Sequence, residues 1–316
     1  MPEKLTALSG NEWTHVQIEQ LKVVFQDVPD VSTFFDGVGL KTFQTSVRGI
    51  ELLSVLNKVD EALFRKYTQS QEDVEGMSLN ETDIRANKML QHPICKALFA
   101  AKTFISTESF VDDFVKHLLH EMGFNAGMLY VAPQMRNKLT FGAVEKMAIA
   151  DFTIIDLLTN AKIVVIEDKY WEKIQMITDS TPQLLANIIA VAQRNNEALV
   201  GVKRDSMGIS KSRASASCQA NLRTVYGIRV SGSVFRFYRI HVGDAILGAL
   251  ENQTFATTDT TMFCYKLEKG LDFMVKKERE KIILILSLLQ EVALFTGELS
   301  PPQSSEDGLQ NAKREG

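Results

Sequence analysis

Two short apolar runs, each of which includes charged residues, limit the possible folds of this chain more than any other feature. Residues 149–155 (IADFTII) and 162–170 (KIVVIEDKY) are rich in β-branched side chains and are separated by a short polar turn, which is typical of a buried β-hairpin. The second run ends in Glu167, Asp168 and Lys169. Because side chains alternate along a strand, Glu167 and Lys169 are expected on one face and Asp168 on the other.

Charged groups at the end of a buried strand are costly unless they are paired, bind a metal or face a solvated cleft. Asp151 on the first strand, followed after a turn by Glu167-x-Lys169 on the second, resembles the PD-(D/E)xK signature of restriction-endonuclease-like nucleases. Ala150 stands where the motif name has proline. The alternative for the same three residues is a structural ion pair at the end of the strand.

Composition excludes several classes of protein. The 316 residues, 45% hydrophobic and 23% charged, are ordinary for a globular protein with one large domain or two modest ones. A net charge of -4 gives no general nucleic-acid signal, so a polyanion would need a local basic patch. Three widely spaced cysteines argue against a disulfide framework or a thiolate zinc site and fit a reducing compartment.

The sequence shows neither a secretory signal at its start nor an apolar run long enough to cross a membrane. We therefore expect an intracellular protein of the cytoplasm or nucleus, without a membrane partner.

Three regions are expected along the chain. Residues 1–100 show helical periodicity, with Val24 and Phe25 assigned to a helical segment, and are predicted to form a mainly helical N-terminal region. Residues 101–298 contain the hairpin and would form the main domain, and residues 299–316 are a polar tail expected to be disordered.

The periodicity around the hairpin predicts an α-β-β-β-α-β order of elements. A helix is expected over residues 107–122, a short strand over 128–132 and a loop over 133–145, before the two strands of the hairpin. A second helix begins at Pro182, and residues 198–202 read as a further strand. This α/β order, a mixed central sheet flanked by helices, resembles the restriction-endonuclease-like core.

The C-terminal half strengthens that resemblance. Residues 224–230 and 234–240 predict a second hairpin, followed by a strand near 261–267 and a long helix over 268–295. The helix QLLANIIAVAQ and the hairpin YGIRVSGSVFRFYRI make the region over about 100–240 similar to the nuclease-like C-terminal domains of Crinkler-type proteins of fungi and oomycetes.

The resemblance implies a metal-dependent phosphodiesterase. Asp151 and Glu167 would bind Mg²⁺ or Mn²⁺ together with the backbone carbonyl of Asp168, since hard oxygen ligands suit these ions. Lys169 would orient the attacking water and stabilise the charge that develops on the phosphate.

Two helical residues are implied as further site residues. Glu108, at the start of the first helix, would bind a second ion or its water, and Gln183, at the start of the second helix, would position Lys169 or the phosphate. Alternatively, Glu108 only complements the helix dipole, and Gln183 is a solvated first-turn residue.

A local basic segment accompanies these acids. Between residues 201 and 240 there are eight Lys and Arg against one acid, with aromatic residues between them. Such a segment is typical of a surface that follows phosphates, or of the solvated face of a hairpin with an aromatic core side. The candidate nucleic-acid-binding residues are Lys203, Arg204, Lys211, Arg213 and Arg223.

The sequence therefore predicts a nuclease that hydrolyses phosphodiester bonds, with DNA preferred over RNA as the substrate. The rival hypothesis is a catalytically silent nuclease-fold protein that binds nucleic acid or a protein partner. A homodimer is compatible with either hypothesis, and the partner of residues 1–100 stays open.

Overall fold

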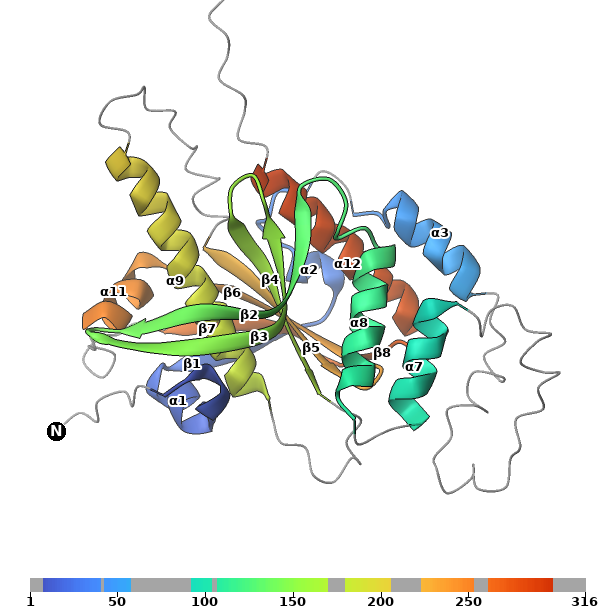
Figure 1. Cartoon of the computed structure of the whole chain (residues 1–316), viewed down its shortest axis with the longest axis horizontal. Helices are drawn as coiled ribbons and strands as arrows, with labels where there is room; N and C mark the ends of the chain where they lie inside the picture. The colour runs from blue at the N-terminus through green and yellow to red at the C-terminus, as the bar shows by residue number, and fades with distance from the viewer. Residues whose placement is uncertain are drawn as a thin grey trace, which may run out of the picture.

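A mixed β-sheet forms the centre of the protein (Figure 1). The computed structural model describes residues 8–40, 43–57, 92–103, 107–169, 180–205, 223–252 and 261–297. In this part of the chain the sheet has eight strands, in the order β1-β7-β6-β5-β4-β3-β2, with β8 paired to β6. The strands are β1 (Val23–Val28), β2 (Leu129–Phe141), β3 (Val144–Asp156), β4 (Ala161–Lys169), β5 (Thr224–Ser231), β6 (Val234–His241), β7 (Met262–Leu267) and β8 (Leu271–Asp272).

Helices cover both faces of the sheet (Figure 1). They are η1 (Gly10–Glu12), α1 (His15–Gln20), α2 (Val31–Phe34), α3 (Val47–Leu56), α7 (Pro93–Thr103), α8 (Ser109–Glu121), α9 (Thr181–Asp205), α11 (Asp244–Asn252) and α12 (Lys276–Gly297). One apolar core lies between the sheet and α8, α12 and their neighbours, and a second lies between the sheet and α9, α11, α1 and η1. The two cores explain why β4 is buried along almost its whole length, since it is covered on both faces.

The predicted hairpin around the acidic residues is confirmed. β3 and β4 pair in antiparallel register, and their turn ends at Asn160, which adopts a positive φ of 55°. β4 then pairs with β5 in parallel, so the connection between them must cross over the sheet, and α9 makes that crossover. The second hairpin, β5 with β6, is also confirmed.

The order α8-β2-β3-β4-α9-β5 has the predicted types of element, but its last strand is β5 and not the strand predicted at residues 198–202, and several boundaries were wrong. Residues 133–141 belong to β2 rather than to a loop, because they continue the pairing with β3 as far as Phe141. Residues 198–202 lie in α9 rather than in a strand, because the helix that begins at Thr181 continues to Asp205.

The N-terminal region also differs from its prediction. Val24 and Phe25 lie in β1, which pairs in parallel with β7, so the mainly helical region contributes an edge strand to the central sheet. The apolar spacing misled here because a short run of apolar residues fits a strand as well as a helix. The short strand β8 and helix α11 were not predicted. The predicted tail, residues 299–316, lies outside the described residues.

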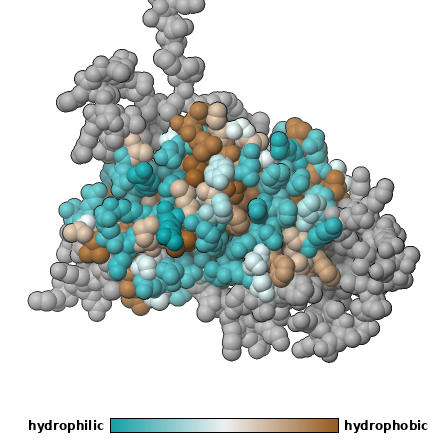
Figure 2. All heavy atoms as spheres, viewed as in Figure 1, coloured by the Kyte–Doolittle hydropathy of each residue, from teal (hydrophilic) through white to brown (hydrophobic). Residues whose placement is uncertain are grey.

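The described surface is mostly hydrophilic in the view of Figure 2, with apolar side chains gathered near the turn between β3 and β4. Leu157 and Leu158 of that turn are exposed. No helix in the described part of the chain is long and apolar enough to cross a membrane.

A close contact between η1 and β3 offers a test of this packing. A Cβ atom on Gly10 would lie 2.8 Å from Ala148 Cβ and 2.9 Å from Ala148 Cα, so it would push against the backbone of β3. We expect Gly10→Ala to lower the free energy of unfolding by about 1–3 kcal/mol, as overpacking does, measured by urea denaturation.

Gly248→Ala is the matched control. Nothing lies within 4 Å of a Cβ at Gly248 inside α11, so this change should stabilise by roughly 0.5–1 kcal/mol. Equal effects of the two substitutions would contradict the docking of η1 on β3.

Candidate functional site

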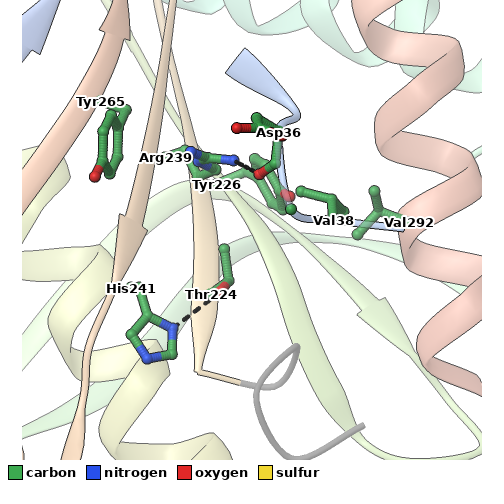
Figure 3. Close-up of a pocket in the computed structure, with 9 residues that line it drawn as sticks. Asp36, Val38, Thr224, Tyr226, Arg239, His241, Tyr265 and Val292 are labelled. Atoms are coloured by element: carbon green, nitrogen blue, oxygen red, sulfur yellow. Dashed lines mark hydrogen bonds between the residues drawn. The ribbon is translucent and has the colours of Figure 1, made fainter. Parts of the chain in front are cut away.

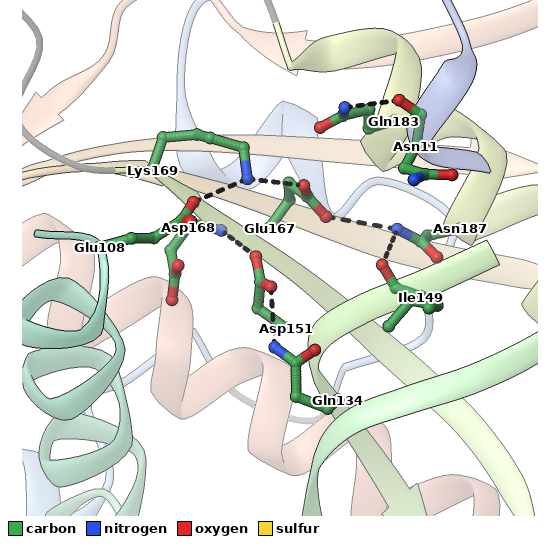
Figure 4. A network of polar contacts seen from close by, with 10 residues as sticks. All are labelled: Asn11, Glu108, Gln134, Ile149, Asp151, Glu167, Asp168, Lys169, Gln183 and Asn187. Atoms are coloured by element: carbon green, nitrogen blue, oxygen red, sulfur yellow. Dashed lines mark hydrogen bonds and ion pairs between the residues drawn. The ribbon is translucent and has the colours of Figure 1, made fainter.

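The carboxyl end of β4 gathers the predicted site residues (Figure 4). Glu167 and Asp168 are almost fully buried, and Lys169 is the last residue of the strand. The strand end is held by β5, because Lys169 pairs with Ser231 and the Lys169 carbonyl accepts a hydrogen bond from the Gly232 amide at 3.2 Å. The charged residues therefore sit on rigid backbone.

Lys169 joins two acids from different elements. Its Nζ lies 3.0 Å from Glu167 Oε1 and 2.9 Å from Glu108 Oε1, and Figure 4 shows it between the two carboxylates. Burial alone would lower the pKa of Lys169, but the neighbouring Glu167, Glu108 and Asp151 carboxylates raise it above its ordinary value. The predicted neighbourhood of Glu167 and Lys169 is confirmed, and Glu108, immediately before α8, completes the group.

Asp151 enters the group from an irregular point of the β2–β3 hairpin. Opposite it, Gln134 adopts a φ of +48°, which is unusual for a residue other than glycine. The Gln134 side-chain amide donates to Asp151 Oδ1 at 3.2 Å, and the backbone amide of Asp168 donates to Asp151 Oδ2 at 2.9 Å. Burial raises the pKa of Asp151, against the opposing effects of the Asp168 amide and Lys169.

Glu167 is held by a residue that sequence reasoning missed. Asn187 of α9, only 1% exposed, donates to Glu167 Oε2 at 3.3 Å and to the Ile149 carbonyl at 3.1 Å. Burial, and then the charge of Asp151, raise the pKa of Glu167 to about 8, although Lys169 opposes them. The signal that could have found Asn187 is that it is the single polar residue of the otherwise apolar run 184–192.

A second acid pair lies on the opposite side of β4. The Asp168 side chain has no exposed surface, and burial together with the neighbouring Asp112 raises the pKa of Asp168 to about 11. Neither carboxyl oxygen of Asp168 has a hydrogen-bond partner among the described residues. Asp112 follows Glu108 by four residues, a spacing that places both acids on the same side of α8, toward β4.

The remaining predicted residues lie elsewhere. The Gln183 amide donates to the Asn11 carbonyl at 3.0 Å, and Figure 4 draws no contact between Gln183 and Lys169. Arg223 forms an ion pair with Asp244 at 2.6 Å. It lies six residues before Arg229, the residue of β5 that pairs with Glu167.

The other basic candidates have no described side chains. Lys203 and Arg204 belong to the last turn of α9, and Lys211 and Arg213 lie outside the described residues. The predicted basic surface beside the carboxylates thus stays a prediction, apart from Arg223, which lies toward the other end of β5.

The donor set fits a hard divalent cation. Asp151, Glu167 and the Asp168 carbonyl offer oxygen ligands. Burial first and the charge of neighbouring acids second raise the pKa of both carboxyls, and a cation would offset both effects. Among the described residues, no group of three or more His, Cys, Asp and Glu side chains is arranged to hold an ion by itself. An ion here would therefore need the carbonyl and water as further ligands.

Comparisons with known proteins add no assignment: no protein-family model and no curated protein matches the chain.

The buried Glu167 makes stability depend on pH. Its pKa is 4.5 in a model peptide and about 8 in the folded protein, so its contribution is fully present below pH 4.5 and is lost as the pH rises to about 8. As the pH rises from 5 to 8 in EDTA, wild type should therefore lose stability that Glu167→Gln keeps. The difference between their free energies of unfolding should grow by up to about 1.4 kcal/mol per pH unit, measured by urea titration.

Glu145→Gln is the control for this comparison. Glu145 is largely exposed beside Lys138, so its variant should follow the wild-type pH profile. Parallel profiles for Glu167→Gln and wild type would contradict the burial of a charged carboxyl at this position.

Proposed function

We propose that this protein is a metal-dependent nuclease of the restriction-endonuclease-like type, and that it hydrolyses phosphodiester bonds in DNA, with RNA as the alternative substrate. The observation that carries the proposal is the Glu108–Lys169–Glu167 contact with Asp151 beside it, at the end of a buried strand. A single ammonium placed among three carboxylates is the constellation expected from the acid-x-Lys motif.

The order of elements supports the same assignment. Asp151, the acid-x-Lys segment and Glu108 come from β3, β4 and the start of α8, the elements to which the resemblance assigns them. The helix after the motif contributes Asn187 instead of Gln183, one turn further along α9. Asn187 donates to Glu167 and to the Ile149 carbonyl, so α9 supports a proposed metal ligand and not, as was predicted for Gln183, Lys169 or the phosphate.

The residues divide the work by chemistry. Asp151, Glu167 and the Asp168 carbonyl would hold a Mg²⁺ or Mn²⁺ ion, which supplies charge neutralisation at the scissile phosphate. Lys169 carries a fixed positive charge that stabilises negative charge developing on the phosphate oxygens. Asn187 orients Glu167, and Gln134 with the Asp168 amide orients Asp151.

One observation favours the silent, binding-only alternative. Each oxygen of Asp151 and Glu167 already accepts a hydrogen bond from a protein donor. A carboxylate oxygen has two acceptor sites, however, so these bonds leave room for a cation at each oxygen. Only a cleavage assay separates the two functions.

Cleavage should depend on Lys169. We expect wild type to nick plasmid or degrade single strands with Mg²⁺ or Mn²⁺ and to stop in EDTA, and Lys169→Ala to lower the rate by about 10²–10³-fold because a charge aimed at the transition state is lost. Nucleic-acid binding, measured by fluorescence anisotropy, should persist in the variant.

Lys138→Ala, which removes an exposed lysine paired with Glu145, is the matched control and should cleave as wild type does. Binding without cleavage by wild type in both metals would support the silent alternative and reject the proposed activity.

Metal should stabilise the protein through the same carboxylates. Asp151→Asn removes one of two mutually repelling groups, so the EDTA-treated variant should be as stable as wild type or more stable, by about 1 kcal/mol. Added Mg²⁺ or Mn²⁺ should raise the Tm of wild type only, because only a ligand that binds the native state stabilises it. A lower Tm of Asp151→Asn in EDTA, with no effect of metal on wild type, would identify a structural ion pair instead.

A further inference from the structure

A cavity of about 240 Å³ lies on the other face of the sheet from Asn187 and α9 (Figure 3). Thr224 and Tyr226 of β5 and Arg239 and His241 of β6 form its floor. These strands place Tyr226 and the neighbouring Phe237 in the core that α12 covers, so the cavity opens toward the α12 side.

The cavity is separate from the carboxylate site. Glu167 pairs with Arg229, and Thr224 precedes Arg229 by five residues in the same strand. At about 3.3 Å per residue, the two positions lie roughly 16 Å apart along β5. The cavity is also on the opposite face from the Glu167 and Asn187 side chains, so one ligand of modest size cannot occupy both sites.

The wall of the cavity is fixed by packing. The Phe35 and Tyr226 rings lie 5.8 Å apart, which anchors the segment after α2 that supplies Asp36 and Val38 to the lining. Val292 of α12 closes another side and is buried. The apolar side chains of Val38 and Val292 thus face the same space as the polar floor (Figure 3).

Arg239 is the cation of this cavity. Its guanidinium carbon lies 4.8 Å from the centroid of the Tyr265 ring, and its Nη1 donates to the Asp36 carbonyl at 2.7 Å. Among the described residues no carboxylate forms an ion pair with Arg239. A guanidinium has five N–H donors, so most of these donors remain for an anion that binds through two oxygens.

The other polar groups of the floor are neutral. His241 Nδ1 and Thr224 Oγ1 lie 3.2 Å apart, and burial together with the Arg223 charge lowers the pKa of His241, against a smaller effect of Asp244. Burial raises the pKa of Tyr226, which keeps its hydroxyl protonated. Asp36 also lines the cavity, but only its backbone carbonyl is bonded to Arg239. The guanidinium of Arg239, the neutral groups of the floor and the apolar side chains of Val38 and Val292 together favour a small anion that carries an apolar or aromatic body.

We propose that this cavity binds a small aromatic anion, with a phosphate or carboxylate group on Arg239 and the ring between the aromatic and valine side chains. The volume is below that of a drug-sized pocket, so it limits the ligand to about one ring with one acidic group. The proposal does not depend on nuclease activity, because no residue of the carboxylate site takes part.

Calorimetric titration of the full chain in EDTA at neutral pH tests the site with defined probes. Phenyl phosphate or benzoate should bind with one-to-one stoichiometry, and the tighter of the two identifies the acidic group. Inorganic phosphate and phenol should each bind at least about tenfold more weakly, because each lacks one half of the recognised chemistry. The absence of saturable binding of both aromatic anions up to about 10 mM would overturn the proposal.

Two variants locate the binding. Arg239→Gln removes the cation, and Thr224→Phe fills the cavity with a residue that suits a strand while Arg239 stays in place. Each should weaken binding of the tighter probe at least about tenfold, since a hydrogen bond to a charged group is lost or blocked.

Arg194→Gln is the matched control because Arg194 is an exposed arginine of α9 that pairs with Glu197, and its variant should bind as wild type does. Lys169→Ala should also bind normally, which separates this site from the carboxylate site. Wild-type binding by both Arg239→Gln and Thr224→Phe, or its loss in Lys169→Ala alone, would overturn the assignment.

Discussion

The ammonium group of Lys169 is the interaction on which the candidate site depends. It contacts Glu167 and Glu108, which come from a buried strand and from the residue before a helix. Without that positive charge, the end of β4 would present buried carboxyls with no compensating charge from the same strand, an arrangement that is expensive in a low-dielectric interior. The lysine therefore joins α8 to the sheet and also provides the charge that the proposed chemistry needs.

The acids around Lys169 are not equivalent, because the two faces of β4 give them different surroundings. Glu167 faces α9 and is held by Lys169 and Asn187, whereas Asp168 faces α8 and lies beside Asp112. The first carboxyl has polar partners on two elements, whereas the second is enclosed by the core, where burial disfavours its charged form. Adjacent residues of one strand thus meet different surroundings because their side chains point to opposite faces.

Burial of several acids also places a limit on stability. The pKa values of Asp151, Glu167 and Asp168 are all raised, so the folded protein becomes less stable as rising pH ionises these groups in the unfolded chain. A bound cation would offset the same charges. The fold tolerates the cost of these buried acids because β4 is a central strand, paired on both sides and covered by helices on both faces.

Local patterns in the sequence were sufficient for the two hairpins, for the existence of the helices α8, α9 and α12, and for the neighbourhood of Glu167 and Lys169, because alternation and helical periodicity are properties of adjacent residues. They misplaced the end of α9 and the start of α12, which begins at Lys276 and not at residue 268. Tertiary structure alone decided that Val24 and Phe25 form an edge strand, since their partner β7 lies more than two hundred residues away. It likewise turned Gln183 toward Asn11, brought Asn187 to Glu167 and paired Asp112 with Asp168. Each of these contacts depends on how a helix is rotated and placed against the sheet, which is set by the packing of two whole cores and not by the spacing of residues along one element.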